Sequence, residues 1–109
     1  MTTSSSNAEL VDLTKGADSS SSLLTRDQGR KLRGDVLEKL NRCERVTLDL
    51  SQARALSPSF ADELFAGLET ELGSDFAKRV RIAGARPDWQ RLIASALQHR
   101  RSQTVQPAE

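Results

Sequence analysis

The chain has few of the side chains that metal and redox sites require. Its 109 residues include one cysteine, Cys43, and one histidine, His99. A single cysteine cannot form an internal disulfide, and the two residues together fall short of the ligands that a zinc site needs. No glycine is followed by Lys-Ser or Lys-Thr, so the phosphate-binding loop of P-loop proteins is also absent. We therefore expect neither a metal ion nor another cofactor.

Aromatic residues and long apolar runs are scarce as well. Three Phe, one Trp and no Tyr leave the core to aliphatic side chains. No apolar run approaches the roughly 20 residues of a membrane-spanning helix, and the N-terminal MTTSSS carries neither the basic segment nor the apolar block of a secretion signal. These absences predict a cytoplasmic protein that does not bind membranes. A net charge of +1 gives no overall attraction to nucleic acid.

Nothing in the sequence assembles a catalytic site. The only histidine lies near the end of the last predicted helix, far along the chain from the serines that could act as nucleophiles. Acid pairs such as Asp62 and Glu63 have the spacing of solvent-exposed helix positions, which does not indicate a buried acid and base. The sequence therefore predicts a protein that is not an enzyme.

The apolar pattern changes repeatedly between the strand and the helix period. Three segments are predicted to be strands, namely residues 10–13, 46–50 and 80–82. Helical periodicity fills residues 26–43, residues 59–72 and a last helix that begins at Pro87. The small, polar segments 1–8 and 102–109 are predicted to be disordered tails on one domain, residues 9–101.

Local signals support the helix boundaries. Thr25 and Gln28 have the spacing of a capping box, and Gly73 follows the second helix as a C-terminal glycine does. The order strand, helix, strand, helix, strand, helix favours right-handed parallel crossovers. We therefore predict a small α/β fold, a β-α-β-α-β-α layer with a mostly parallel short sheet and helices packed on it. So narrow a sheet leaves edges and one face uncovered, which predicts self-association as a homodimer.

A functional crevice in such a sheet lies beyond the carboxyl ends of the strands. This rule gathers the segments 14–25, 51–59 and 84–87 on one rim. Anions bound at helix N-termini on this rim would have four candidate ligands, which are Lys15, Thr25, Arg26 and Arg86.

Two serines precede the second helix. Ser57 before Pro58 fits an N-cap with proline at the first helical position, and Ser59 with Asp62 fits a second register of the same motif. A helix N-terminus also stabilises a phosphate attached to a serine there. Asp62 and Glu63 would oppose the added charge, so that phosphorylation would change how this surface interacts with a partner.

The central part of the chain resembles a known family. The strand VTLDL at residues 46–50 and the segment LSPSFADELF at residues 56–65 resemble the central block of bacterial STAS-like domains of unassigned function. These are relatives of the sulfate transporter and anti-sigma factor antagonist (STAS) domain. The helix opening LTRDQ at residues 24–28 and the last strand and helix at residues 79–96 are similar too. The resemblance extends over residues 23–97.

The resemblance implies a regulatory, non-enzymatic signalling module. In anti-sigma factor antagonists the loop after the central strand reads Asp-Ser-Ser-Gly, and a serine kinase of the histidine-kinase-like ATPase fold phosphorylates the second serine. That serine corresponds to Ser59, while Ser57, Pro58 and Phe60 replace the Asp, the first Ser and the Gly. The resemblance thus gives Ser59 as the phospho-acceptor, and a kinase or regulator as the partner. The implied partner-binding residues are Ser57, Pro58, Ser59, Phe60, Asp62 and Glu63.

Two other functions remain open. Basic residues are concentrated towards the C-terminus, which would allow nucleic-acid binding through Arg79, Arg81, Arg86, Arg91, Arg100 and Arg101. Trp89 is the only aromatic residue among them, and the helical period places it inward. The alternative is a sensor of a small ligand or nucleotide that uses the rim formed by Lys15, Thr25, Arg26, Ser59 and Arg86.

Overall fold

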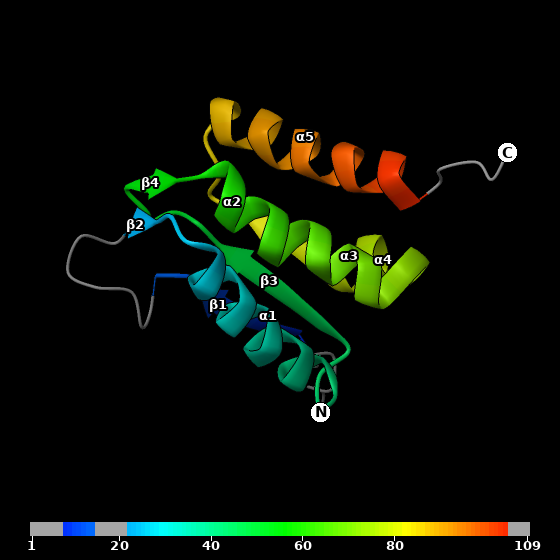
Figure 1. Ribbon diagram of the computed structural model, residues 1–109. Helices are drawn as coiled ribbons and strands as arrows, with labels where there is room; N and C mark the ends of the chain where they lie inside the picture. Colours follow the sequence, from blue (N-terminus) through cyan, green and yellow to red (C-terminus); the bar gives the residue numbers. More distant parts are fainter. Residues whose placement is uncertain (1–7, 15–21, 105–109) are drawn as a thin grey trace, which may run out of the picture.

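The computed structural model describes residues 8–14 and 22–104, and its centre is a parallel sheet of three strands (Figure 1). These strands are β1 (Ala8–Asp12), β3 (Arg45–Asp49) and β5 (Val80–Ala83), in the order β1-β3-β5. Each lies within two residues of its predicted position. The predicted α/β fold with a parallel sheet is therefore confirmed.

The helices follow the predicted order, with differences at their ends. Helix α1 (Arg26–Leu40) begins at a capping box in which Thr25 and Gln28 each bond to the backbone of the other, as predicted. It ends three residues before Cys43, where Arg79 donates hydrogen bonds to the carbonyls of Leu40 at 2.6 Å and Cys43 at 3.0 Å. Helix α5 (Pro87–Thr104) closes the fold. Strand β1 includes residue 8, and helix α5 includes residues 102–104. The composition of these two segments predicts that they belong to the tails.

The middle helix is continuous from residue 58 to residue 72, but it is not uniform. It consists of α2 (Pro58–Ala61), a π-helical turn η2 (Asp62–Ala66) and α3 (Gly67–Leu72). Gly73 ends it with a φ of 62°, a conformation that glycine adopts readily, as predicted. This helix packs between α1 and α5 (Figure 1). Its apolar side chains form the centre of the core, where Phe60, Leu64, Phe65 and Leu68 are fully buried.

Four short elements escape the sequence analysis. The strands β2 (Ser22–Leu23) and β4 (Ala55–Leu56) pair in parallel as a second sheet beside the start of the middle helix. The 3-10 turn η3 (Gly73–Asp75) and helix α4 (Phe76–Arg79) connect α3 to β5. Segments of two to four residues are too short to show an apolar period, so tertiary contacts define them.

The helices lie against one face of the three-stranded sheet. Val46 and Leu48 of β3 are fully buried, and their register neighbours Val11 and Val80 are nearly so. Successive strand residues point to opposite faces, so Leu10, Thr47 and Arg81 form a row on the other face. Leu10 is 65% exposed there. Among the described residues, no helix has the length and apolar character to cross a membrane.

Candidate functional site

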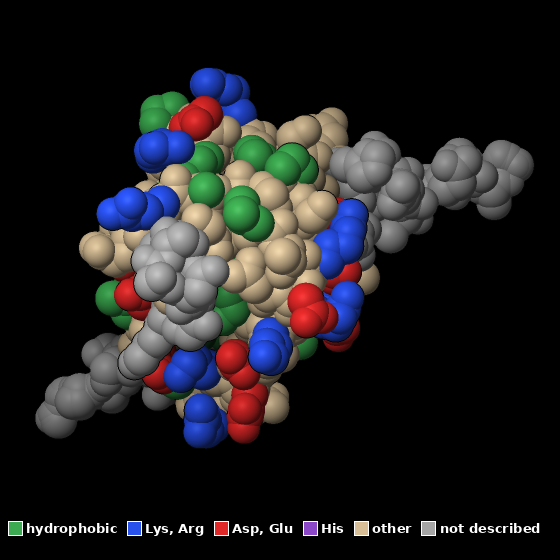
Figure 2. Space-filling model, turned by 60° about the vertical axis from the view of Figure 1, so that its left-hand side comes forward, with side chains coloured by type: hydrophobic (Ala, Val, Ile, Leu, Met, Phe, Trp, Pro, Cys, Tyr) green, Lys and Arg blue, Asp and Glu red, His purple; other side chains and the backbone are tan. Residues whose placement is uncertain are grey.

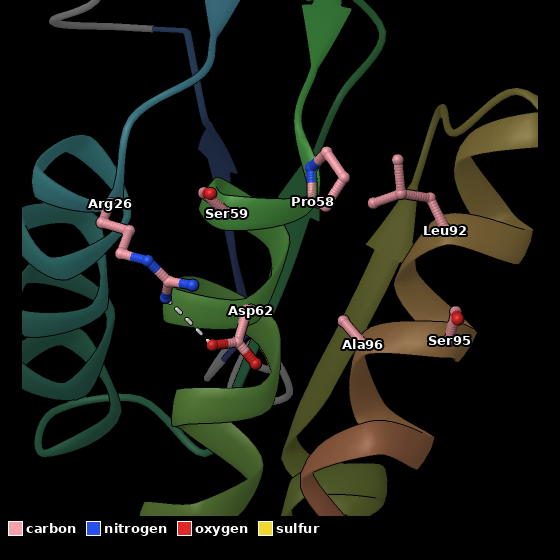
Figure 3. A pocket seen from close by; sticks show the side chains of 7 residues that line it. All are labelled: Arg26, Pro58, Ser59, Asp62, Leu92, Ser95 and Ala96. Carbon is pink, nitrogen blue, oxygen red and sulfur yellow. Dashed lines mark hydrogen bonds and ion pairs between the residues drawn. The ribbon is translucent and has the colours of Figure 1, made fainter.

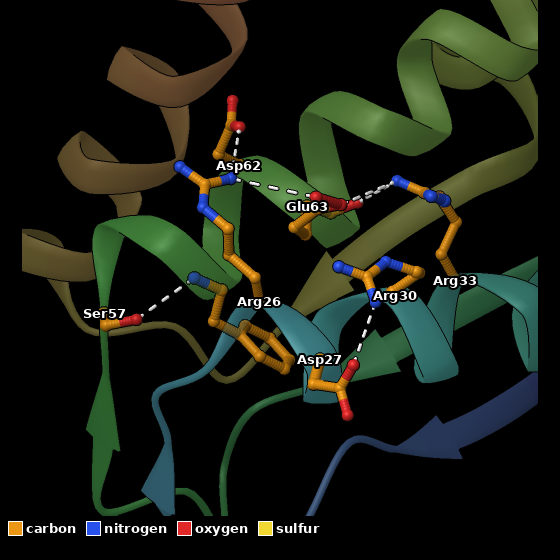
Figure 4. Close-up of polar contacts among 8 residues, drawn as sticks. Arg26, Asp27, Arg30, Arg33, Ser57, Asp62 and Glu63 are labelled. Carbon is orange, nitrogen blue, oxygen red and sulfur yellow. Dashed lines mark hydrogen bonds and ion pairs between the residues drawn. The ribbon is translucent and has the colours of Figure 1, made fainter.

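Ser57 fixes the start of the middle helix. Its N–H donates to the Leu23 carbonyl at 3.0 Å, and its Oγ donates to the Leu24 carbonyl at 2.6 Å. The same Oγ accepts a hydrogen bond from the Phe60 N–H at 3.1 Å (Figure 4). Ser57 is therefore the N-cap with Pro58 at the first helical position, as predicted, and the helix does not use the alternative register of Ser59 and Asp62.

An open pocket of about 590 Å³ lies where three helices meet. It is bounded by the N-terminus of α1, the first turns of the middle helix and the middle of α5. Figure 3 shows Arg26 reaching from α1 toward Asp62, while Pro58 faces Leu92 of α5. The lining residues are Arg26, Pro58, Ser59, Asp62, Leu92, Ser95 and Ala96.

Ser59 is the residue of this pocket that the sequence singles out. It is partly exposed and lies on the side of its helical turn that faces α1 (Figure 3). Its hydroxyl has no hydrogen-bond partner among the described residues, because Ser57 supplies the cap. The structure therefore presents Ser59 as an accessible, unengaged hydroxyl at a helix start.

Charged side chains join α1 to the middle helix beside Ser59. Arg26 lies 3.1 Å from a carboxylate oxygen of Asp62 and 3.8 Å from one of Glu63 (Figure 4). Arg33, about two helical turns further along α1, lies 3.2 Å from the Glu63 carboxylate. The Arg26 side chain is 52% exposed, whereas that of Glu63 is only 16% exposed. Arg26 is thus the charged group of this network that can change partners most easily.

The π-helical turn explains why Arg33 is bound here. The Gly67 N–H donates to the carbonyls of Asp62 and Leu64, so it does not bond to Glu63 as it would in an α-helix. Nη1 of Arg33 donates instead to the Glu63 carbonyl at 2.8 Å. A Cβ atom at Gly67 would collide with the Arg33 guanidinium. The absence of a side chain at residue 67 therefore makes room for this contact.

One predicted partner-binding residue does not belong to the surface. Phe60 is fully buried in the core and cannot contact a partner. It belongs to the hydrophobic core, and its backbone carbonyl packs against Gly29 of α1. The prediction for Phe60 is therefore wrong, whereas the other predicted residues, Ser57, Pro58, Ser59, Asp62 and Glu63, are exposed or partly exposed.

One of the comparisons with known proteins finds a match, and it is to a family. A family described as a STAS-like domain of unknown function matches residues 28–90, more than half of the chain, and this range includes the pocket residues Pro58, Ser59 and Asp62. The chain belongs to this family. No curated protein and no solved structure matches it.

The rim residues of this STAS-like domain are only partly brought together. Arg26 lines the pocket with Ser59, as the rim hypothesis requires. The Thr25 hydroxyl is occupied by the cap of α1, where it accepts from the Gln28 N–H at 3.0 Å. The Arg86 guanidinium lies 4.2 Å from the ring centre of Trp89, and Arg86 is not among the pocket residues. Lys15 lies outside the described residues.

The basic residues near the C-terminus of the STAS-like domain do not point to a common surface. Arg79 is bound to backbone carbonyls at the end of α1. Arg81 lies on the uncovered face of the sheet, and Arg86 and Arg91 are on or beside α5. The side chains of Arg100 and Arg101 lie outside the described part of the chain. The described residues therefore give no continuous basic groove for a nucleic-acid backbone.

The surface of the STAS-like domain has two kinds of region. Figure 2 shows hydrophobic side chains gathered towards the top, at the height of α5, and mixed acidic and basic side chains lower down, at the height of α1. Pro58, Leu92 and Ala96 supply apolar lining to the pocket. Ser59 therefore lies where an apolar surface adjoins a charged one.

Four residues of the site are absent from the predicted site residues. Leu92, Ser95 and Ala96 line the pocket from α5, and Arg33 binds the Glu63 carbonyl. The helical period assigns Leu92 to the core, and it is only partly buried. Nothing in the local sequence around Arg33 or Ser95 indicates which helix lies opposite, so no sequence signal identifies them.

Proposed function

We propose that this STAS-like domain is a non-enzymatic regulatory module that binds a protein partner through the pocket region, and that phosphorylation of Ser59 controls the binding. The observation that carries this proposal is the unengaged Ser59 hydroxyl in an open pocket between α1 and α5. A kinase requires an accessible hydroxyl, and Ser59 provides one without loss of a helix cap.

The surroundings of Ser59 give a phosphate both a favourable and an unfavourable neighbour. Arg26 lines the same pocket and could donate charge-assisted hydrogen bonds to phosphate oxygens. Asp62 lines it too, and its carboxylate would repel the phosphate. Phosphorylation would therefore draw Arg26 from Asp62, and the surface charge around the pocket would be redistributed.

The apolar lining supplies the partner contact. Pro58, Leu92 and Ala96 are exposed or partly exposed, and we define them together with Ser59 and Ser95 as the docking surface. A partner that covers these side chains also covers Ser59. A doubly charged phosphate would then be desolvated on binding, so that phosphorylation weakens the complex. This is the direction that the resemblance to anti-sigma factor antagonists implies.

Phosphosite mapping tests the modification. The full chain is recovered from its source cells as wild type, Ser59→Ala and Ser95→Ala. We expect phosphate on Ser59 in the wild type and in Ser95→Ala, and none at this helix in Ser59→Ala. Ser95 is the matched control because it lines the same pocket. Phosphate confined to another site would contradict the role of Ser59.

A binding measurement tests the docking surface independently. The partner recovered with the wild type is titrated against Leu92→Glu and against Leu24→Glu, a control at an exposed leucine outside the pocket. We expect Leu92→Glu to weaken binding by at least about tenfold, as loss of a central apolar contact does. Equal affinities for both variants would contradict the proposed surface.

A second candidate function is supported by the pocket itself. Its volume of about 590 Å³ lies in the range of small-molecule sites, and Arg26 is a suitable anion ligand. Binding of ATP or inorganic phosphate would raise the melting temperature of the wild type and not that of Arg26→Gln. No rise with either compound would eliminate this function for these ligands.

A further inference from the structure

In the described part of the chain, the outer edge of β1 presents a defined set of backbone groups. Within the described residues β1 pairs with β3 alone. The Leu13 N–H donates to the Asp49 carbonyl at 3.1 Å, which shows that residue 13 directs its backbone groups towards β3. The groups alternate along a strand, so those of Glu9 and Val11 also face β3. Those of Ala8, Leu10 and Asp12 therefore point away from the sheet.

The outward N–H and carbonyl groups of one copy can pair with the same groups of a second copy. When two copies of β1 run antiparallel with Leu10 opposite Leu10, each Leu10 N–H faces the Leu10 carbonyl of the second copy. In the same register Ala8 lies opposite Asp12 of the second copy, and both pairs are of the hydrogen-bonded type. This register forms about six backbone hydrogen bonds and extends the sheet across both copies.

The Leu10 side chain favours the same register. It is 65% exposed, and only Leu24 is a comparably exposed large hydrophobic residue in the described part of the chain. In a hydrogen-bonded antiparallel pair the two Leu10 Cα atoms would be about 5.5 Å apart, with both side chains on the uncovered face of the sheet. Each leucine would remove the other from water.

The antiparallel register relates the two copies by a two-fold axis at Leu10. Charged side chains of α1 lie beside this axis. A groove of about 430 Å³ runs between β1 and α1, and Asp35, Glu38, Lys39 and Arg42 are part of its lining. Lys39 lies 3.0 Å from the Glu9 carboxylate, which places residue 39 level with residue 9. The two-fold axis would pass through Leu10, one residue beyond Glu9 and therefore about 3.3 Å further along the strand. At about 1.5 Å per helix residue, this distance corresponds to about two residues before Lys39 in α1. With this alignment, Asp35 would lie near the level of Lys39 of the second copy.

We propose that two copies of this chain associate through antiparallel pairing of their β1 edges, centred on Leu10. The occupant is a second copy because backbone, apolar and charge complementarity all meet at one register. The surface is separate from Ser59 and the docking surface, so this proposal does not depend on the proposed function.

Charge exchange at Leu10 tests the register. Sedimentation velocity is measured for the full chain as wild type, Leu10→Asp, Leu10→Lys and an equimolar mixture of the two variants. We expect a dimer for the wild type, loss of the dimer for each variant because like charges lie opposite, and a dimer again in the mixture. A monomeric wild type, or a dimer that persists in both variants, would overturn the proposal.

A cysteine cross-link provides a second measurement that does not require a charged substitution. Leu10→Cys is prepared in a Cys43→Ser background, with Leu24→Cys as the control at the other exposed leucine. The expected Cα separation of about 5.5 Å lies within the range of disulfides. We expect a covalent dimer on mild oxidation of Leu10→Cys and a much smaller yield for Leu24→Cys. Equal yields would contradict the proposal, and circular dichroism verifies that each variant is folded.

Discussion

Gly29 packs directly against the backbone of Phe60. A Cβ atom at residue 29 would lie 3.0 Å from the Phe60 carbonyl oxygen and 2.9 Å from the Glu63 Cβ. Helix α1 therefore approaches the start of the middle helix at a distance that requires glycine. This contact holds Arg26 and Arg33 close to Asp62 and Glu63.

The first prediction compares two glycines of α1. Gly29→Ala should lower the free energy of unfolding by about 1–2 kcal/mol, because overpacking outweighs the gain in helix propensity. Gly34→Ala should raise it by about 0.5–1 kcal/mol, because nothing lies within 4 Å of a Cβ there. Urea unfolding measures both values. A stabilising Gly29→Ala would show that α1 can move away from Phe60 without cost.

The second prediction concerns the carbonyl that the π-helical turn leaves for Arg33. Arg33→Met keeps an apolar stem but removes the donor to the Glu63 carbonyl, and it should destabilise the fold by about 1–3 kcal/mol. The control is Arg30→Met, which removes an exposed ion pair with Asp27 and should cost less than about 0.5 kcal/mol. Chemical denaturation compares the two. Similar losses would contradict a special role for Arg33.

The third prediction separates the two serines of the helix start. Ser57→Ala removes the cap of α2 and the bond to the Leu24 carbonyl, and should cost about 1–2 kcal/mol. Ser59→Ala should change stability by less than about 0.5 kcal/mol. Thermal and urea unfolding measure both. A large loss for Ser59→Ala would show that its hydroxyl is structural and not available for modification.

The fourth prediction concerns pH and Glu9. The hydrogen bond from Lys39, and next that from Cys43, hold the pKa of Glu9 below its ordinary value of 4.5. A lowered pKa stabilises the folded state above pH 4.5, and this contribution is lost as the pH falls below that value. The stability difference between wild type and Glu9→Gln should therefore shrink on acidification. The measurement extends down to pH 3, about 1.5 units below the ordinary pKa of a glutamate. A stability difference that stays constant over this range would contradict the ion pair.

Cys43 is the other member of this contact. Burial, and then its hydrogen bond to Glu9, raise the pKa of the Cys43 thiol. The thiol therefore stays protonated near neutral pH, where it donates to the carboxylate. Cys43→Ser should preserve the donor, which makes it a suitable background for the cross-linking experiment.

Much of the fold and part of the site follow from sequence. The alternating apolar residues of β3 and the capping box at Thr25 act over a few neighbouring residues, and both are found as predicted. The same holds for Ser57 as the N-cap and for Gly73 as the end of the middle helix. Local periodicity and capping chemistry are written in adjacent residues, so they can be recognised without knowledge of the rest of the chain.

The tertiary structure decided what lies opposite each of these elements. Phe60 is in the core because the helix turns it inward, and β2 and β4 exist because two loops meet at Ser57. The pairing of Arg33 with the Glu63 carbonyl joins residues 30 positions apart in the chain. Such contacts depend on the packing of whole helices, which no short sequence pattern encodes. The chemistry of Ser59 is thus set by its own residue type, whereas its exposure beside Arg26 and Leu92 is set by the approach of α1 and α5.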